Sequence, residues 1–109
     1  MSVLEISPLL SVPGVRLDGE LDLATVPLFT EALVELAAER EVYLDLATLA
    51  FLDSSGLHAI LDVARSEDGD RSVILVNPTA AIRRSLEIAG VAEHPRVEIR
   101  HAEAVKAVA

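Results

Sequence analysis

The pattern of hydrophobic and polar positions changes abruptly once, near the middle of the chain. Residues 42–52 form a dense apolar run that begins with strand-forming side chains and stops at Asp53-Ser54-Ser55-Gly56. Beyond that stop, apolar residues recur at the helical spacing i, i+3, i+4 and i+7, at Leu57, Ile60, Leu61 and Ala64. The pattern predicts a buried strand followed by a helix, with Asp53 or Ser54 as its N-cap.

Two strands and a helix are expected before this junction. Residues 3–7 and 15–18 alternate between apolar and polar, and the prolines between them predict a hairpin at a sheet edge. The segment 19–22 is typical of a turn, and Asp22 is expected to cap a helix with Pro27 in its first turn. The buried stripe predicted for that helix consists of Phe29, Leu33, Leu36 and Ala37.

The second half of the chain continues the alternation of strands and helices. Its expected elements, in order, are a polar turn at 66–70, a buried strand at 72–76, a helix from 77–78 to 90, an edge strand at 95–100 and a closing helix at 102–109. Asn77 is expected to cap the helix that follows it, with Pro78 at the first helical position, and Gly90 is expected to end that helix.

The predicted order of elements is therefore ββαβαβαβα. This order indicates one α/β domain over residues 1–109, with a mixed, mostly parallel sheet of about four to five strands and helices packed against it. In open sheets of this type, ligands and partners use the loops beyond the carboxyl ends of the strands, and Ser54 lies on such a loop. If the strand before Ser54 lies beside the second strand, Glu20 and Asp22 lie on the same edge of the sheet.

Composition narrows the classes of function. A net charge of −9 disfavours direct binding to nucleic acid or insertion at an anionic membrane surface. Aromatic residues make up only 3% of the chain, which leaves no platform for stacking bases. The chain has no cysteine for a disulfide or a thiolate metal site, and neither a signal segment nor a membrane-length apolar run is visible. We therefore expect a cytoplasmic protein.

Catalysis and cofactor binding are not expected. The one set of residues worth testing for a hydrolase combines Ser54 or Ser55 with His58 and either Asp22 or Asp53, but the Gly-x-Ser-x-Gly elbow is missing. The three histidines are too scattered for a metal site, and no glycine-rich loop with a lysine is present to hold a nucleotide phosphate. Any phosphoryl group must therefore come from a partner.

Three blocks of sequence, in the same order and at the same spacing, resemble the STAS domain of bacterial anti-sigma factor antagonists. The blocks are Gly19-Glu20-Leu21-Asp22, Phe51-Leu52-Asp53-Ser54-Ser55-Gly56-Leu57, and Val76-Asn77-Pro78 with Ile82-Arg83-Arg84-Ser85-Leu86 and Ala89-Gly90-Val91. The resemblance implies a partner-switching protein. Unphosphorylated, such a protein binds an anti-sigma factor that is also a serine kinase and so releases the sigma factor. Phosphorylation of the antagonist by that kinase ends the interaction, and a serine phosphatase removes the phosphate and restores the binding form.

The resemblance also implies which residues take part. The phosphoacceptor is the serine that immediately follows the aspartate, which is Ser54. The surroundings of the phosphosite and the partner-docking surface are implied to consist of Glu20, Asp22, Asp53, Ser55, Gly56, Leu57 and His58. A small residue is usual at the position of His58, and a bulky titratable side chain there is expected to narrow the choice of partner.

Two other hypotheses remain open from the sequence. STAS subunits also serve as scaffolds in stress-sensing assemblies and as small subunits of lipid-transporting ABC complexes, and these use the same loop and helix. The Asp-Ser-Ser-Gly acceptor motif favours the antagonist. Nucleotide binding by the domain itself is the weaker hypothesis because no phosphate-cradling loop is visible.

Overall fold

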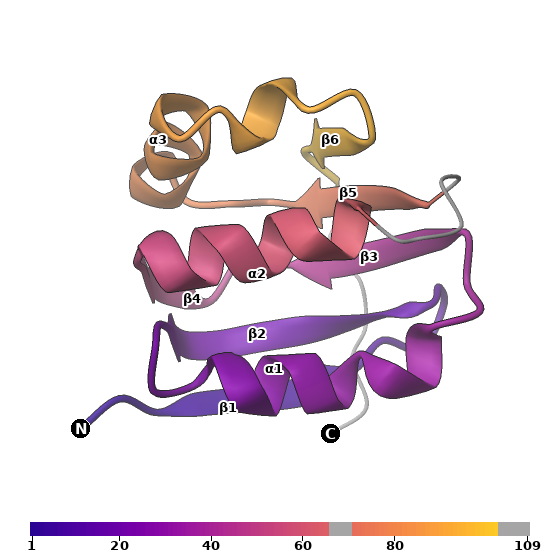
Figure 1. Ribbon diagram of the computed structural model, residues 1–109, viewed down its shortest axis with the longest axis horizontal. Coiled ribbons are helices and arrows are strands. Elements are labelled where there is room, and N and C mark those ends of the chain that lie inside the picture. The colour runs from indigo at the N-terminus through magenta and orange to yellow at the C-terminus, as the bar shows by residue number, and fades with distance from the viewer. Residues whose placement is uncertain (66–70, 103–109) are drawn as a thin grey trace.

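The computed structural model describes residues 1–65 and 71–102, which form a sheet with helices against it (Figure 1). The order of strands in the sheet is β1-β2-β3-β5-β6, and β4 pairs with β2 off this path. The strands are β1 (Leu4–Pro8), β2 (Gly14–Leu21), β3 (Glu41–Asp45), β4 (Leu49–Leu52), β5 (Ser72–Val76) and β6 (Val97–Arg100). The pairing of β1 with β2 is antiparallel and every other pairing is parallel. The predicted mixed, mostly parallel sheet is confirmed, as are the hairpin and the edge positions of β1 and β6.

The sheet has one strand more than the upper number expected, because the apolar run 42–52 is divided. Asp45 accepts a hydrogen bond from the backbone N–H of Ala47 at 3.0 Å, and the chain turns at Leu46, whose carbonyl accepts from Leu49 N–H at 3.1 Å. β3 then pairs with the first half of β2 and β4 with its end. Asp45 and Thr48 are the polar residues that interrupt the run here, and two isolated polar positions do not distinguish a turn from the polar face of a single strand.

The helices are α1 (Val26–Ala32), α2 (Ser54–Ala64) and α3 (Ala80–Ile88), with short 3₁₀ turns η1 (Val34–Leu36) and η2 (Val91–Glu93). Figure 1 shows α1 and α2 side by side over the same face of the sheet, with α1 over the edge that contains β1. The first expected helix is shorter than its pattern suggested: it ends at Ala32, and Ala37 is exposed. Gly90, at φ 77°, ends α3 as expected.

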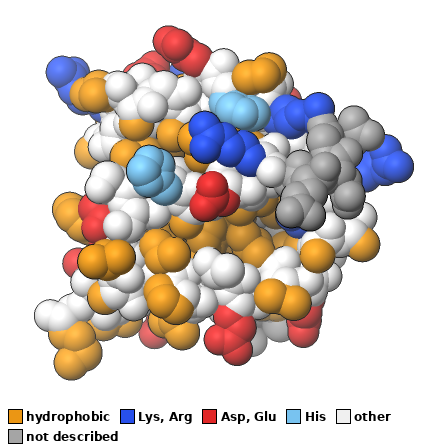
Figure 2. Space-filling view, viewed as in Figure 1, with side chains coloured by type: hydrophobic (Ala, Val, Ile, Leu, Met, Phe, Trp, Pro, Cys, Tyr) orange, Lys and Arg blue, Asp and Glu red, His pale blue; other side chains and the backbone are white. Residues whose placement is uncertain are grey.

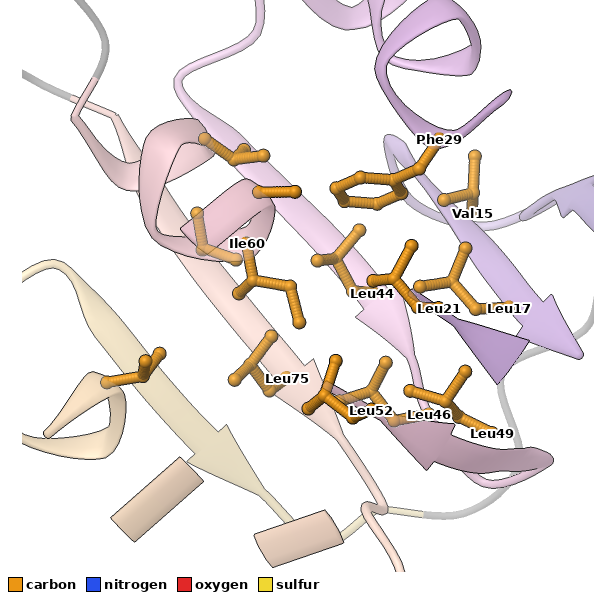
Figure 3. Packing of buried hydrophobic residues seen from close by; sticks show 14 of the residues in the cluster. Val15, Leu17, Leu21, Phe29, Leu44, Leu46, Leu49, Leu52, Ile60 and Leu75 are labelled. Atoms are coloured by element: carbon orange, nitrogen blue, oxygen red, sulfur yellow. The ribbon is translucent and has the colours of Figure 1, made fainter. Parts of the chain in front are cut away.

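The core lies between the helices and the sheet, and it is almost entirely aliphatic. Figure 3 shows leucines from β2, β3, β4 and β5 pointing toward Ile60 of α2 and Phe29 of α1. Phe29 and Ile60 are 1% and 0% exposed, so they bury nearly their whole side chains. At about 1.5–3 kcal/mol for each such side chain, this layer provides the main driving force that holds α2 against the end of the sheet.

Three local expectations were wrong. Gly19, Glu20 and Leu21 belong to β2, which has a bulge at Gly19 where φ is 116°. Asp22 does not cap α1, whose N-cap residue is Thr25 without a side-chain cap hydrogen bond. Asn77 does not begin α3. The cap there is Thr79, which accepts from Ile82 N–H at 3.3 Å. The expected turn at 66–70 and nearly all of the closing helix lie outside the described residues.

Asn77 instead joins the ends of β5 and β6. Its φ is 53°, a left-handed conformation that asparagine adopts more readily than most residues. Its side-chain Nδ2 donates to the carbonyl of Ala102 at 2.6 Å, and its Oδ1 accepts from Ala102 N–H at 2.9 Å. The side chain therefore continues the pairing of the two strands beyond their last residues.

Two substitutions of Asn77 should separate the contribution of its left-handed backbone conformation from that of its side-chain hydrogen bonds. Asn77→Gly keeps the backbone conformation and loses both side-chain hydrogen bonds, so the free energy of unfolding should fall by about 1 kcal/mol. Asn77→Ala also places a Cβ in the left-handed region, which should cost about 1 kcal/mol more. Urea denaturation of both variants measures the difference. Equal stabilities of the two variants would contradict a role for the backbone conformation.

Candidate functional site

The N-terminus of α2 is capped by Asp53, one of the two residues that the sequence offered as the N-cap. Its Oδ1 accepts a hydrogen bond from the backbone N–H of Gly56 at 2.9 Å, which satisfies one of the first-turn donors of the helix. Its Oδ2 accepts from the backbone N–H of Leu23 at 3.2 Å. Ser54 is the first helical residue and is exposed. Asp53 therefore carries the cap, and the Ser54 hydroxyl is left accessible.

Gly56 allows the first turn of α2 to approach the sheet closely. A Cβ at this position would lie 2.4 Å from the carbonyl oxygen of Leu21 and 2.7 Å from a methyl carbon of Leu52. The backbone N–H of Asp53 also donates to the Leu21 carbonyl at 3.3 Å. The predicted importance of Gly56 thus has a packing basis, because a side chain there would push the helix away from the ends of β2 and β4.

The loop after β2 is organised around Asp22. Its Oδ1 accepts from the backbone N–H groups of Ala24 at 3.0 Å and Thr25 at 3.2 Å, and its Oδ2 accepts from the hydroxyl of Ser2. The hydrogen bond from Ser2, followed by those from Thr25 and Ala24, holds the pKa of the Asp22 carboxyl below its usual range. Asp22 therefore remains ionised beside the N-terminus of α2.

Glu20 and Thr25 complete this loop. The Glu20 carboxylate accepts from the backbone N–H of Val3 at 3.0 Å, so it holds the start of the chain instead of facing α2. Thr25 is buried, and its hydroxyl donates to the carbonyl of Glu20 at 2.8 Å. The structural role of Thr25 was not predicted, because a single threonine in a polar loop carries no periodic signal.

The loops after β2 and β4 lie side by side, as the sequence predicted for the case in which their strands are neighbours. Leu21 and Leu52 are paired at the carboxyl ends of these two parallel strands. Asp22 and Asp53 follow immediately on each strand, and the hydrogen bond from Leu23 to Asp53 joins the loops directly. This edge thus holds two carboxylates and the exposed Ser54.

His58 lies farther along α2 and is exposed. It lines a groove of about 280 Å³ between α1 and α2 together with Ser55 and Asp62. Within residues 1–65 and 71–102, no hydrogen bond joins His58 to Ser54 or Ser55, and no group of three metal-ligating side chains is present. The hydrolase arrangement considered from the sequence is therefore not assembled in the described part of the chain.

Exposed apolar side chains beside the site were also missed. Leu23 is 75% exposed, and its backbone is bonded to Asp53. Phe51 is 50% exposed in β4, two residues before Asp53. Leu23, an apolar residue inside a polar loop, was the available sign of a binding surface. A single exposed leucine is common on protein surfaces, however, so this sign is weak. Leu23, beside Asp53 and Ser54, gives this edge a mixed apolar and acidic character, whereas Phe51 points to the other face of β4 from Leu52, which packs under α2.

Comparison with known protein families and curated proteins gives consistent matches. The family model described as STAS domain matches residues 8–104. An anti-sigma-B factor antagonist of Staphylococcus epidermidis is 30% identical over 80 residues, which cover 71% of this chain and 74% of that protein. The anti-sigma-B factor antagonist of Staphylococcus aureus strain NCTC 8325 is 29% identical over the same shares of the two chains.

Solved structures share the fold. The anti-sigma factor antagonist SpoIIAA in its unphosphorylated form has a TM-score of 0.67 and 24% identity, covering 94% of this chain and 90% of its own. The Bacillus cell fate determinant SpoIIAA in the phosphorylated form has a TM-score of 0.55 and 24% identity, covering 94% and 93%. An anti-sigma factor antagonist from Mycobacterium paratuberculosis has a TM-score of 0.72 and 21% identity, covering 89% and 85%.

The close approach at Gly56 predicts a large effect of a small substitution. Gly56→Ala should lower the free energy of unfolding by about 2 kcal/mol, because the added methyl group meets a backbone carbonyl that cannot move without disturbing β2. Ser55→Ala, one position earlier in the same turn, should change it by less than about 0.5 kcal/mol. Urea denaturation of both variants tests this, and comparable losses would rule out the steric explanation.

The pKa of Asp22 should respond to Ser2. The stability that the Asp22 carboxylate contributes is present above its unfolded pKa of about 3.9 and is lost as the pH falls through its lower folded pKa. NMR titration of the carboxyl carbon should show the lowered pKa in the unsubstituted chain, and Ser2→Ala should raise it toward the usual range. Ser11→Ala, which alters the loop between β1 and β2, serves as the control. An unchanged pKa in Ser2→Ala would remove Ser2 as the cause.

Proposed function

The chain belongs to the STAS domain family and, within it, to the anti-sigma factor antagonists, and from this we propose that it works as a phosphorylation-controlled partner switch. Unphosphorylated, it binds an anti-sigma factor that is also a serine kinase, and the sigma factor is released. The kinase then transfers a phosphoryl group from ATP to the Ser54 hydroxyl, and the modified protein leaves. A serine phosphatase restores the binding form. The protein itself acts by binding, in the cytoplasm, and not as an enzyme.

The observation that carries this proposal is the position of Ser54 in the first turn of α2. The side chain is exposed, so a kinase can reach it, and the cap hydrogen bond belongs to Asp53 instead. First-turn N–H groups and the positive end of the helix dipole favour a negative group at this place. The modification can therefore be accommodated without unfolding the helix.

The charge of the phosphate supplies the switch. A phosphoserine adds roughly −1.5 to −2 charges at neutral pH. At Ser54 these charges would join the carboxylates of Asp22 and Asp53 on the same sheet edge. An acidic or apolar partner surface that fits the unmodified edge would then meet like charge and a strongly hydrated group. Binding would be blocked by electrostatic repulsion and by size, with the sheet unchanged.

The docking surface that we propose surrounds this serine. Leu23 offers an exposed apolar side chain beside Asp53, and Leu57 is half-buried in the next turn of α2. Gly56 keeps the helix close to the sheet, so these groups are presented on a rigid base. Ser55 and His58 face the groove between α1 and α2, where a bulky histidine can discriminate between related kinases. Affinity would come from the apolar contacts and partner choice from the polar ones.

A negative charge at position 54 should prevent capture of the kinase. In a lysate of the source organism with magnesium and ADP, the unsubstituted chain should retain an ATP-binding protein that Ser54→Asp does not retain. The affinity loss measured with the purified partner should be about a hundredfold, since like charge at an interface costs several kcal/mol. With ATP, mass spectrometry should find one phosphoryl group, on Ser54, and Ser54→Ala should stay unmodified.

Two matched variants make the result specific. Ser11→Asp adds the same charge in the loop at the opposite end of β2 and should bind as the unsubstituted chain does. Ser55→Ala should still accept phosphate. If Ser54→Asp and the unsubstituted chain retain the same transporter or sensor assembly equally well, Ser54 is only the first residue of a helix and the partner-switch proposal fails.

A further inference from the structure

The outer edge of β1 presents backbone groups that can pair with another strand. The β1–β2 hairpin is antiparallel, with Ile6 opposite Leu17. The Glu20 N–H donates to the Val3 carbonyl, and the Leu9 N–H donates to the Gly14 carbonyl. The odd-numbered residues along β1 therefore direct their backbone hydrogen-bonding groups toward β2. Because the bonding direction alternates along a strand, the N–H and C=O groups of Leu4 and Ile6 point away from β2. Pro8 adds an outward carbonyl.

The same alternate residues line a groove. A cavity of about 540 Å³ is lined by residues of β1, α1 and η1. Figure 1 shows α1 over the edge of the sheet that contains β1. We call this cavity the β1 groove and define it by Leu4, Ile6, Pro8, Leu28, Glu31 and Glu35. Leu28 is 50% exposed, so the helical wall is apolar where it faces the opening. Among the described residues no strand pairs with the outer edge of β1. Outward backbone groups and an apolar floor thus occur along one line, which is the arrangement that recognises an added strand.

The charge of the β1 groove selects its occupant. Glu31 and Glu35 stand one helical turn apart on the wall, and both are exposed. In Figure 2, hydrophobic and acidic side chains gather along the lower edge, where Figure 1 places α1 and β1, while most basic side chains lie over the upper half. A second copy of this chain would bring the same acidic rim and a further −9 charge to the edge. A basic segment meets neither obstacle.

We propose that the β1 groove binds an extended, basic segment of a partner protein, which joins the sheet as a strand beside β1. Its alternate apolar side chains lie on Leu4 and Ile6, and its lysines or arginines reach Glu31 and Glu35. Backbone pairing with β1 gives affinity without regard to side chains, and the alternation of apolar and basic residues gives specificity. Ser54, Asp22 and Asp53 are not among the residues that line this groove.

A peptide of defined pattern is the probe. A fluorescent eight-residue peptide that alternates valine and arginine should bind in an anisotropy titration. A peptide of the same composition, with four valines followed by four arginines, should bind about tenfold more weakly, because half its side chains cannot occupy their places. N-methylation of alternate backbone nitrogens should abolish binding. Equal binding of the alternating and block peptides would overturn the proposal.

Two sets of variants locate the contact. Glu31→Gln with Glu35→Gln should weaken binding about tenfold, the effect of two exposed ion pairs of up to about 0.7 kcal/mol each. The matched control is Glu5→Gln with Asp18→Asn, which removes the same charge from directly opposed residues of β1 and β2 whose side chains do not line the groove. The control variant should bind the peptide within about twofold of the affinity of the unsubstituted chain. An equal loss of affinity in both double variants would mean that net charge alone explains the effect.

Backbone pairing has its own test. Ile6→Pro removes an outward N–H without touching the β1–β2 bonds, and Pro8 already shows that this strand tolerates proline at an equivalent position. Its peptide affinity should fall well below that of Ile6→Ala, which loses the side chain alone, while thermal melts confirm that both variants are folded. Sedimentation equilibrium completes the test. A dimer that Ile6→Pro dissociates would make a second copy the occupant and overturn the proposal.

Discussion

The contact between the first turn of α2 and the end of β2 is the constraint on which the candidate site depends. A single glycine permits it, since any Cβ at residue 56 would lie within 2.4 Å of the Leu21 carbonyl. The aliphatic core beneath α2 presses the helix down, and Asp53 ties its end both to Gly56 and to the neighbouring loop. Ser54 is thus accessible on an otherwise rigid junction, whose position is set by packing and not by the serine itself.

The junction was predictable because its signals are local and strong. A dense apolar run, a capping residue and a helical apolar stripe follow one another within residues 42–64, and their order indicates a strand followed by a capped helix. The sequence predicted that the two loops are neighbours only if their strands are adjacent, and the pairing of β2 with β4 meets that condition. Asp22 was chosen correctly as part of this edge but for the wrong local reason, since it binds loop N–H groups instead of capping α1.

Other features depend on tertiary contacts that leave no periodic trace. The turn between β3 and β4 is marked only by Asp45 and Thr48 in an otherwise apolar run, and isolated polar residues also occur inside single strands. Asn77 before a proline looks like a helix cap, yet pairing with Ala102 outweighs that preference. The ion pair between the partly exposed Arg16 and the buried Asp45, at 3.0 Å across two adjacent strands, could be predicted only with the register known. The β1 groove likewise exists only once α1 is placed over the hairpin.

The division of labour between Asp53 and Ser54 has a consequence for the lifetime of the protein. Cellular proteases act on the unfolded fraction, so a modification that changes folding free energy by 1–2 kcal/mol also changes abundance several-fold. The cap hydrogen bond here belongs to Asp53, so phosphorylation of the neighbouring Ser54, as we propose, would leave that bond in place. In the proposed switch, phosphorylation would therefore not cost the stability that this cap contributes. Such a switch would change which partner is bound without loss of this cap, so degradation that begins with loss of the cap would not accompany signalling.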